Sequence, residues 1–313
     1  MLEVFRYTAI HKAQWNKFAA RARQSSFLFQ RDYMDYHAQR FRDNSLIVLR
    51  NGRIHALLPA NIDGQTLYSH QGLTYGGLIT DNKATTADVC QIFKEINNYL
   101  RAEGIRRLIY KPTPWIYHLL PAEEDLYAIS TICNAHLIAR HISSTICPTH
   151  RLPFTESRKS GIRKAQREAL KVREATSFES FWKILTQNLE NKYHVRPVHT
   201  LDEIVLLKSR FPEAIRLFQV ENPSGTVLGG TVIYETQRVV HTQYISASPV
   251  GKVQGALDLL FHYLLTEEYK DVEYFDFGKS SEGDGHDLNT QLIFQKEGFG
   301  GRGVCYDTYE WIL

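Results

Sequence analysis

The sequence predicts two consecutive α/β units, each with a mixed β-sheet and helices on both of its faces. Each half of the chain shows the same order of elements: a helix, antiparallel strands, a long helix and a further strand. Trp15 and Trp182 are 167 positions apart, and so are Leu108 and Phe275 in the strands that follow the two long helices. A repeated order at one offset indicates a duplicated unit. The order differs from the regular strand–helix alternation of a doubly wound fold.

Local patterns predict the elements of the first half. Asn51-Gly52 lies between two apolar runs and predicts a hairpin, because both residues accept a positive φ. The apolar spacing over residues 86–103 predicts an amphipathic helix, which Gly104 ends. The remaining predictions are a helix at residues 11–23, strands at residues 2–8, 45–50, 53–60, 65–69 and 106–110, a loop at residues 70–81 and a β-rich run at residues 131–147.

The second half repeats this plan. The predicted helices cover residues 178–189, 255–269 and 288–297, and the predicted strands cover residues 214–221, 227–234, 239–246, 272–277 and 304–312. Pro148 and Pro153 interrupt the pattern between the halves. We therefore predict two domains, at residues 1–152 and 153–313.

Composition narrows the classes of function. The net charge of the 313 residues is only +3, which is too weak for a protein that coats nucleic acid. The four cysteines form no CxxC pair, so we expect free thiols rather than a zinc site or disulfides. The sequence shows neither a secretory leader nor an apolar run of about 18 residues, so we expect a cytoplasmic protein without a membrane span.

The segment at residues 156–174 concentrates positive charge and is predicted to form one helix. It carries seven basic and three acidic residues, so its local charge of +4 exceeds that of the whole chain. Guanidinium and ammonium groups suit phosphate oxygens, and residues four apart share a helix face. The alternative is a solvated helix between the domains. The predicted phosphate ligands are Arg158, Arg163, Lys164 and Arg167.

The turn before the helix at residues 255–269 is a candidate cofactor-binding site. A glycine-containing turn at a helix start presents free backbone N–H groups and the positive end of the helix dipole, which suit a pyrophosphate. Residues 252–257 resemble the [Q/R]-x-x-G-x-[G/A] loop of GNAT-superfamily acetyltransferases and match it at the central glycine. The alternative is an ordinary helix start. The predicted cofactor-binding residues are Lys252, Gln254, Gly255 and Ala256.

Polar side chains also gather after the strand at residues 272–277, where a glycine-rich loop follows. Loops at strand ends are frequent ligand sites. Asp276, which follows aromatic residues, is a candidate to orient or deprotonate an amine. Lys296, on a short helix, is a candidate to stabilise an oxyanion. The structural alternatives are a capping or turn role for Asp276 and a surface role for Lys296.

Three other patterns predict no function. Residues 298–303 spell GxGxxG but follow a helix and precede a strand, which reverses the order of a dinucleotide-binding turn. Residues 276–278 spell the kinase triplet DFG without the other kinase motifs. The thirteen histidines include no HExxH pair, and residues 283–287 lack calcium-loop spacing, so no metal is predicted.

Several segments together resemble the FemAB group of transferases. Residues 158–172, with IRKA at their centre, are similar to the basic R-x-x-I-[RK]-K-A segment of that group. Residues 274–278 (YFDFG) match its Tyr-x-Asp-Phe-Gly element, and residues 294–300 (FQKEGFG) match its F-x-K-x-x-F-G element. Residues 25–30 and 68–81 are similar to two early elements, with Leu73 where the family has proline. The similarity covers most of the chain.

This resemblance implies a tandem GNAT fold and the transfer of an acyl or aminoacyl group to an amine. It implies that Lys296 activates the donor carbonyl and that Asp81 lies near the acceptor. The expected donor is acyl-CoA, lying against the strand at residues 239–246 with Tyr244 beside it. The expected acceptor is a small-molecule amine, such as an amino sugar or a precursor of the cell envelope or of a polysaccharide.

Two alternatives stay open. FemAB members proper use aminoacyl-tRNA and modify peptidoglycan precursors, so the chain is alternatively an aminoacyltransferase with tRNA as a partner. The absence of a long heptad segment, which would form an inserted helical arm, favours the thioester. The other alternative is a catalytically silent protein that binds an anionic sugar or nucleotide through residues 156–174. The sequence does not identify the acyl group, the acceptor or the oligomeric state.

Overall fold

The computed structural model describes residues 2–313, apart from the side chain of Tyr193, and the chain divides into two compact units. The first unit comprises the chain up to residue 141 together with residues 281–287 and 305–313. The second comprises residues 142–280 and 288–304. The C-terminal segment therefore belongs to the first unit, although the predicted domains, 1–152 and 153–313, place it in the second half. The boundary between the two domains stays a prediction.

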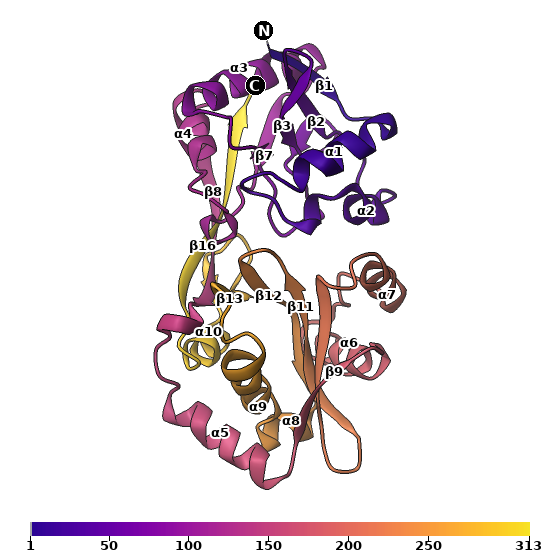
Figure 1. Cartoon of the computed structure of the whole chain (residues 1–313), viewed down its shortest axis with the longest axis vertical. Helices are drawn as coiled ribbons and strands as arrows, with labels where there is room; N and C mark the ends of the chain where they lie inside the picture. Colours follow the sequence, from indigo (N-terminus) through magenta and orange to yellow (C-terminus); the bar gives the residue numbers. More distant parts are fainter. Residues whose placement is uncertain (1) are drawn as a thin grey trace. The chain divides into compact units, whose positions relative to one another are not determined.

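The first unit combines a small antiparallel sheet, ordered β1-β2-β3-β6, with a second group of strands, β4, β5, β7 and the end of β16 (Figure 1). Its strands are β1 (Leu2–Arg6), β2 (Leu46–Arg50), β3 (Arg53–Leu58), β4 (Asn61–Asp63), β5 (Thr66–Tyr68), β6 (Ile79–Thr80) and β7 (Arg107–Tyr110). Its α-helices are α1 (Lys12–Ala19), α2 (Arg31–Met34), α3 (Thr86–Ala102) and α4 (Glu124–Thr131). Short 3-10 turns lie at Ala9–His11, Phe27–Phe29, Asp35–His37 and Trp115–Tyr117.

Local sequence explains the long helix and the hairpin of this unit. Thr85 and Asp88 form a capping box at the start of α3, each side chain accepting a hydrogen bond from the backbone N–H of the other residue. The apolar face of α3 then packs into the core of the unit. Asn51 and Gly52, between β2 and β3, have φ values of 52° and 71°. The predicted helix and the predicted hairpin are therefore confirmed.

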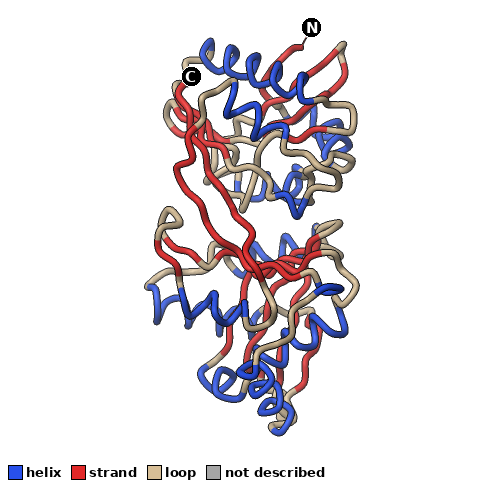
Figure 2. The backbone as a smooth tube through the Cα atoms, turned by 90° about the vertical axis from the view of Figure 1, so that its left-hand side faces the viewer, coloured by secondary structure: helices blue, strands red, loops and turns tan. Residues whose placement is uncertain are grey.

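The second unit is one sheet with helices on both faces (Figures 1 and 2). Its strands follow the order β8-β13-β12-β11-β10-β9. The remaining strands of the chain are β8 (His136–Ile146), β9 (Lys171–Ala175), β10 (Ile215–Glu221), β11 (Val227–Glu235), β12 (Val239–Ala247), β13 (Tyr274–Lys279), β14 (Ser281–Glu282), β15 (Asp287–Leu288) and β16 (Arg302–Ile312). The remaining helices are α5 (Glu156–Arg167), α6 (Glu179–Tyr193), α7 (Leu201–Arg210), α8 (Pro249–Gln254), α9 (Ala256–Tyr263) and α10 (Thr290–Glu297), with a 3-10 turn at Pro148–His150 and a π turn at Leu264–Glu268.

The structure corrects three of the predicted helices. The basic segment at residues 156–174 is not one helix: α5 ends at Arg167, Ala169 takes a φ of 53°, and residues 171–175 form β9. The helix predicted at residues 11–23 ends at Ala19. The helix predicted from residue 255 begins earlier, as α8, and Gly255 with a φ of 78° separates α8 from α9. A left-handed residue, Ala169, thus follows α5 where one continuous helix is predicted, and Gly255 lies at the predicted start of α9.

The pairing of the parallel strands in each unit agrees with the predicted sequence offset of 167 positions between the two halves. In the first unit β5 and β7 run parallel, with Leu67 opposite Leu108. In the second unit β12 and β13 run parallel, with Val240 opposite Phe275. Leu108 and Phe275, 167 positions apart, therefore occupy the same place in the parallel strand pair of each unit.

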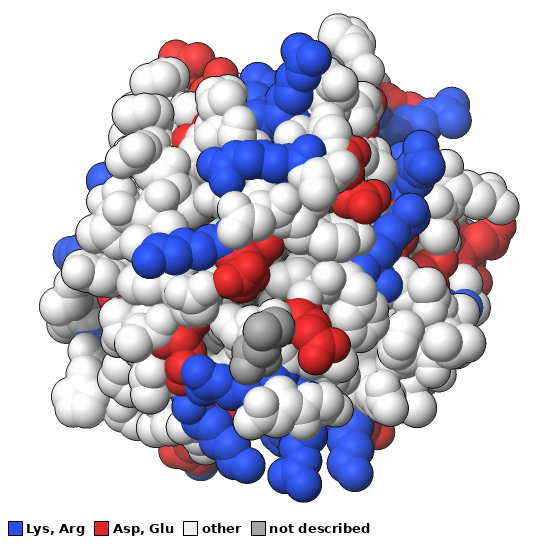
Figure 3. Space-filling model, turned by 90° about the horizontal axis from the view of Figure 1, so that it is seen from above, with Lys and Arg blue, Asp and Glu red and all other residues white. Residues whose placement is uncertain are grey.

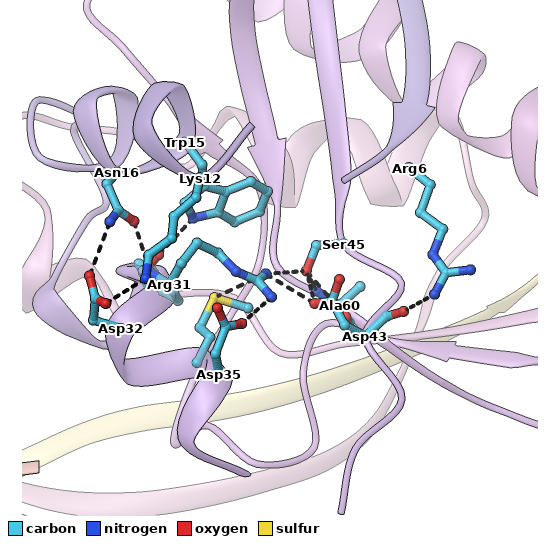
Figure 4. A network of polar contacts seen from close by, with 12 residues as sticks. Arg6, Lys12, Trp15, Asn16, Arg31, Asp32, Asp35, Asp43, Ser45 and Ala60 are labelled. Atoms are coloured by element: carbon cyan, nitrogen blue, oxygen red, sulfur yellow. Dashed lines mark hydrogen bonds and ion pairs between the residues drawn. The ribbon is translucent and has the colours of Figure 1, made fainter. Parts of the chain in front are cut away.

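A buried guanidinium joins several segments of the first unit (Figure 4). The Arg31 side chain, 4% exposed, donates to Asp43 at 3.0 Å and to the Ser45 hydroxyl at 3.3 Å, and it also pairs with Asp35. Its guanidinium carbon lies 4.0 Å from the centroid of the Tyr7 ring. Removal of one partner from a buried ion pair costs about 3–5 kcal/mol, because the other charge stays without compensation.

We expect Arg31→Met to lower the free energy of unfolding by about 3 kcal/mol, because Asp43 and Asp35 lose their buried cation. Urea denaturation followed by circular dichroism measures the change. Lys12→Met is the matched control, because Lys12 and Asp32 form a pair whose side chains are 46% and 48% exposed. Such exposed pairs contribute less than about 1 kcal/mol. Equal losses in the two variants would contradict the importance of the Arg31 network.

Basic and acidic side chains are interspersed on the face shown in Figure 3, which agrees with the net charge of +3. Within residues 2–313, no helix combines the length and the hydropathy that crossing a membrane requires. In the same residues, His, Cys, Asp and Glu side chains form no group of three suited to a metal ion.

Candidate active site

β12 and β13 separate part-way along their length in the second unit. Their parallel register joins residues 239–241 to residues 274–276, and within the described residues 2–313 no later residue of β12 pairs with β13. β12 stays paired with β11 as far as Ala247, with a register shift that leaves Gln243 as an extra residue. The edge of β12 at residues 242–247, which we call the open edge, therefore has backbone groups that a ligand can pair with.

The corresponding position in the first unit is closed by its own chain. Beyond β5, the Ser69 N–H donates to the Ile109 carbonyl at 2.9 Å, and the Lys111 N–H donates to the Ser69 hydroxyl at 2.7 Å. The Gly76 N–H donates to the Lys111 carbonyl at 2.9 Å, so the loop predicted at residues 70–81 folds back beside β7. A Cβ atom on Gly76 would lie 1.7 Å from the Ser69 carbonyl oxygen, so this loop packs directly against the strand end.

Asp276 is the last residue of β13 that pairs with β12, and it is completely buried. Its carboxylate accepts hydrogen bonds from the Ser143 hydroxyl, from the Thr145 hydroxyl at 3.0 Å and from Nδ1 of His241 at 2.8 Å. Ser143 and Thr145 come from β8 on one side of β13, and His241 comes from β12 on the other. These donors stabilise the buried carboxylate, which has no surface left for a substrate.

His241 is held through one ring nitrogen, and the rest of its ring is partly accessible. Its side chain is 12% exposed, whereas that of Asp276 is 0% exposed. Because an ionised Asp276 accepts the Nδ1–H, the lone pair of the neutral ring lies on Nε2. This is the arrangement of a general base with an orienting carboxylate. The same register position of the first unit holds Tyr68 opposite Ile109 and has no carboxylate.

Glycine at position 278 makes room for this ring. Gly278 has a φ of 71°, and a Cβ atom there would lie 3.1 Å from Cε1 of His241. A larger residue would therefore be strained and would press on the imidazole.

Lys296 reaches the same region from α10. Its ammonium donates to the carbonyls of Gly278 and Lys279, both at 2.8 Å, just after Asp276 along β13. Burial lowers the pKa of Lys296 to about 8, while the negative charge of Asp276 acts in the opposite direction. Two of the three ammonium hydrogens are used in these bonds, and the third is left for a further acceptor such as an oxyanion.

The predicted donor turn lies within two short helices. Lys252 and Gln254 belong to α8, and Gly255 separates α8 from α9. Ser248 caps α8, because its hydroxyl accepts the Gly251 N–H at 3.0 Å and its carbonyl accepts the Lys252 N–H at 2.9 Å. The chain itself therefore uses part of the set of N–H groups that a pyrophosphate would require.

Helix α5 covers the junction between α8 and α9. A Cβ atom on Gly255 would lie 2.3 Å from the Gly161 carbonyl oxygen, and one on Gly161 would lie 1.9 Å from the Asp258 carboxylate. Arg158, a predicted phosphate ligand, pairs with Asp258 at 2.5 Å in a largely buried position. These contacts occupy the approach to the predicted pyrophosphate position. Ala256, which follows the junction, is completely buried.

The other basic residues of α5 keep their charges at the surface. Arg163 pairs with Glu156, and both side chains are more than half exposed. Within residues 2–313, Lys164 and Arg167 form no ion pair. Arg158 therefore stabilises the packing of α5 against α9 through its ion pair with Asp258. Phosphate binding stays a prediction for Arg163, Lys164 and Arg167.

Asp81 and Tyr244 make contacts within their own units. Asp81, in the first unit, accepts a backbone N–H two residues later at 3.0 Å and lies 3.6 Å from Arg21. The Tyr244 hydroxyl contacts Nδ1 of His199 at 2.5 Å, and its ring packs edge-on against Trp182 at 5.2 Å. The contacts of Asp81 stabilise a turn, and those of Tyr244 fix its side chain beside β12. A role in binding stays a prediction for both residues.

Sequence reasoning identified two of the clustered residues, Asp276 and Lys296, but did not identify the partners of Asp276. The imidazole of His241 is 35 positions away, and the hydroxyls of β8 are more than 130 positions away. The position of His241 opposite Asp276, in the parallel register of β12 and β13, is the signal that would have found it. That signal becomes visible only when the register of β12 against β13 is known.

Comparisons with known proteins identify the fold. No sequence profile of a known family and no curated protein sequence matches this chain. The structure is similar to a crystal structure of FemX, with 9% identity, 99% of this chain and 97% of that chain covered, and a TM-score of 0.69. It is also similar to L-PGS from Bacillus licheniformis, with 12% identity, 85% and 83% coverage and a TM-score of 0.56.

A third similar structure is a tandem GNAT protein from the clavulanic acid biosynthesis pathway, with 11% identity, 100% and 98% coverage and a TM-score of 0.52. At these identities the similarity establishes the fold. The predicted fold class, an α/β protein with two tandem GNAT-like halves, is confirmed.

Proposed function

We propose that this chain, which has a tandem GNAT fold, is an N-acyltransferase whose second unit moves an acyl group from an activated ester or thioester to an amine. The observation that carries the proposal is the open edge of β12 beside the Asp276–His241 pair and Lys296. The open edge supplies backbone N–H groups that polarise a carbonyl. The imidazole supplies a proton acceptor, and the ammonium supplies a charge opposite to that of an oxyanion. The resemblance to FemAB proteins points to the same chemistry.

The proposed reaction proceeds through one tetrahedral intermediate. The amine nitrogen forms a bond to the acyl carbon, and the carbonyl oxygen becomes an oxyanion that accepts hydrogen bonds from Lys296 and from the open edge. Nε2 of His241 takes a proton from the attacking nitrogen, while Asp276 stabilises the imidazolium. The bond to the leaving sulfur or oxygen then breaks, and the leaving group takes that proton from His241. Orientation of both substrates in one site supplies much of the rate.

The donor belongs to one of two chemical classes. An acyl-CoA, the donor expected from the sequence, carries a pyrophosphate, and the contacts of α5 with Gly255 and Asp258 cover the turn predicted to hold it. An aminoacyl ester of tRNA needs no such turn, and the exposed cations of α5, Arg163 and Arg167, suit backbone phosphates. The contacts of α5 over the predicted turn therefore support aminoacyl-tRNA as the second candidate donor. The proposed acceptor is an amino sugar or another precursor of the cell envelope or of a polysaccharide.

A transfer assay tests the proposal. Purified protein is incubated with either a panel of acyl-CoAs or a pool of aminoacyl-tRNAs, and with glucosamine or a UDP-linked muramyl peptide as acceptor. Mass spectrometry then detects the acylated amine. We expect an enzyme-dependent product with one donor class. Product formation that is equal with and without the protein, for every donor and acceptor, would contradict the proposal.

A further inference from the structure

We infer that the second unit contains another ligand site, a pocket between the start of α5 and the end of α9 that binds an organic anion carrying an apolar group. The pocket has a volume of 440 Å³, within the range of about 300–1,000 Å³ that is typical of small-molecule sites. None of its lining residues belongs to the open edge of β12, and neither Asp276 nor Lys296 lines it. Arg163 is also one of the cations proposed above for tRNA phosphates, but the pocket does not require that role, so the inference does not depend on the proposed function.

One wall of the pocket is apolar and fixed in place. Ile162, on α5, is 7% exposed and contributes to this wall together with Phe154. The Phe154 ring packs edge-on against Phe299 at 5.5 Å and against the His262 ring at 6.1 Å. A ring held on two sides offers a preformed apolar surface, so a ligand does not have to order it on binding.

Three cations line the rim, and no Asp or Glu is among the lining residues. Arg151 donates to the Leu265 carbonyl at 3.2 Å, which leaves most of its five N–H groups for a ligand. Lys159 forms no ion pair within residues 2–313. The partner of Arg163, Glu156, is 72% exposed, and such a surface pair is weak enough for a ligand anion to replace it.

A histidine adds a neutral polar group to the same wall. Nδ1 of His262 is buried and has no hydrogen-bond partner within the described residues. Burial lowers the pKa of His262, and the charge of Arg151 lowers it further, which favours a neutral ring. A buried ring nitrogen without a partner is costly unless a ligand satisfies it. Cations, an apolar wall and one polar nitrogen together fit a phosphate ester with an aromatic or aliphatic substituent.

Isothermal titration calorimetry with 1-naphthyl phosphate tests this site. We expect saturable binding at least ten times tighter than that of inorganic phosphate or of 1-naphthol, because neither of these combines the anion with the apolar group. The double variant Lys159→Gln/Arg163→Gln is expected to weaken binding at least tenfold. The matched control is Lys164→Gln/Arg167→Gln, which removes the same charge from the same helix outside the pocket and is expected to change binding less than threefold.

Four results would overturn the inference. Equal weakening in the two double variants would show that the general charge of α5, not the pocket, attracts the anion. Inorganic phosphate binding as tightly as naphthyl phosphate would remove the role of the apolar wall, and the absence of saturable binding would remove the site. Binding to vesicles that contain phosphatidylglycerol is measured in parallel, to distinguish a lipid headgroup from a soluble phosphate ester as the ligand. Binding to these vesicles without competition from naphthyl phosphate would assign the basic residues to a membrane surface instead.

Discussion

Lys296→Met is expected to lower kcat at least 100-fold while it changes the KM for the donor by less than about threefold. Loss of a single oxyanion donor typically costs about 100–1,000-fold in kcat, and a group that acts on the transition state affects kcat more than substrate binding. The variant also leaves the carbonyls of Gly278 and Lys279 without their donor, so thermal unfolding is measured in parallel. Lys270→Met, at an exposed lysine, is the control for the substitution itself.

The pH dependence of kcat separates the chemical role of Lys296 from a structural one. Its pKa is lowered to about 8 by burial, so the ammonium is protonated at neutral pH and loses a hydrogen as the pH rises through 8. We expect the activity of the wild-type protein to fall above pH 8 and Lys296→Met to lack this alkaline decrease. Retention of wild-type kcat by the folded variant would exclude Lys296 from the reaction.

His241→Ala is expected to lower kcat by about 100–10,000-fold, the usual contribution of a general base. Removal of the imidazole leaves a space beside Asp276, so added imidazole is expected to restore part of the activity of this variant. The same addition is expected to leave the low activity of Lys296→Met unchanged. His286→Ala, at an exposed histidine, is the control. Activity of His241→Ala within threefold of the wild type would show that another group takes the proton.

Asp276 acts through His241 in this mechanism, because its carboxylate is buried and accepts three side-chain hydrogen bonds. In the proposed mechanism it is therefore a positioning residue, and the sequence-based prediction that it orients or deprotonates the amine stays untested. The two units differ at this point: the first has an isoleucine at the corresponding position and closes the adjoining strand end with its own loop. The open strand edge and the acid–imidazole pair are thus features of the second unit, and the corresponding strand pair of the first unit has neither.

The parts of the fold that depend on local chemistry were predictable from the sequence. The Asn51-Gly52 hairpin and the capped helix α3 follow from backbone preferences within a few residues. Pairings between distant residues were not predictable, because periodicity contains no information about register. For this reason the sequence alone does not show that residues 305–313 pack within the first compact unit.

The candidate site shows the same division between local and distant information. Asp276 and Lys296 lie in short motifs that resemble a known family, so the sequence was sufficient to single them out as candidates. His241 has no motif, and its role depends on a parallel pairing with β13 that only the structure shows. The packing of Gly161 of α5 against Gly255, beside the predicted cofactor-binding turn, likewise cannot be read from either segment alone. Cofactor binding at this turn stays a prediction.

Hydrogen–deuterium exchange during donor binding tests most directly whether the open edge of β12 holds the acyl donor. The protein is measured alone, with acetyl-CoA, and with a hydrolysis-resistant aminoacyl-tRNA analogue. Binding of the true donor is predicted to slow exchange of the amides at residues 242–247 and to leave the loop at residues 70–77 of the first unit unchanged. Saturable binding of a donor with unchanged exchange at residues 242–247 would contradict a donor site in the second unit.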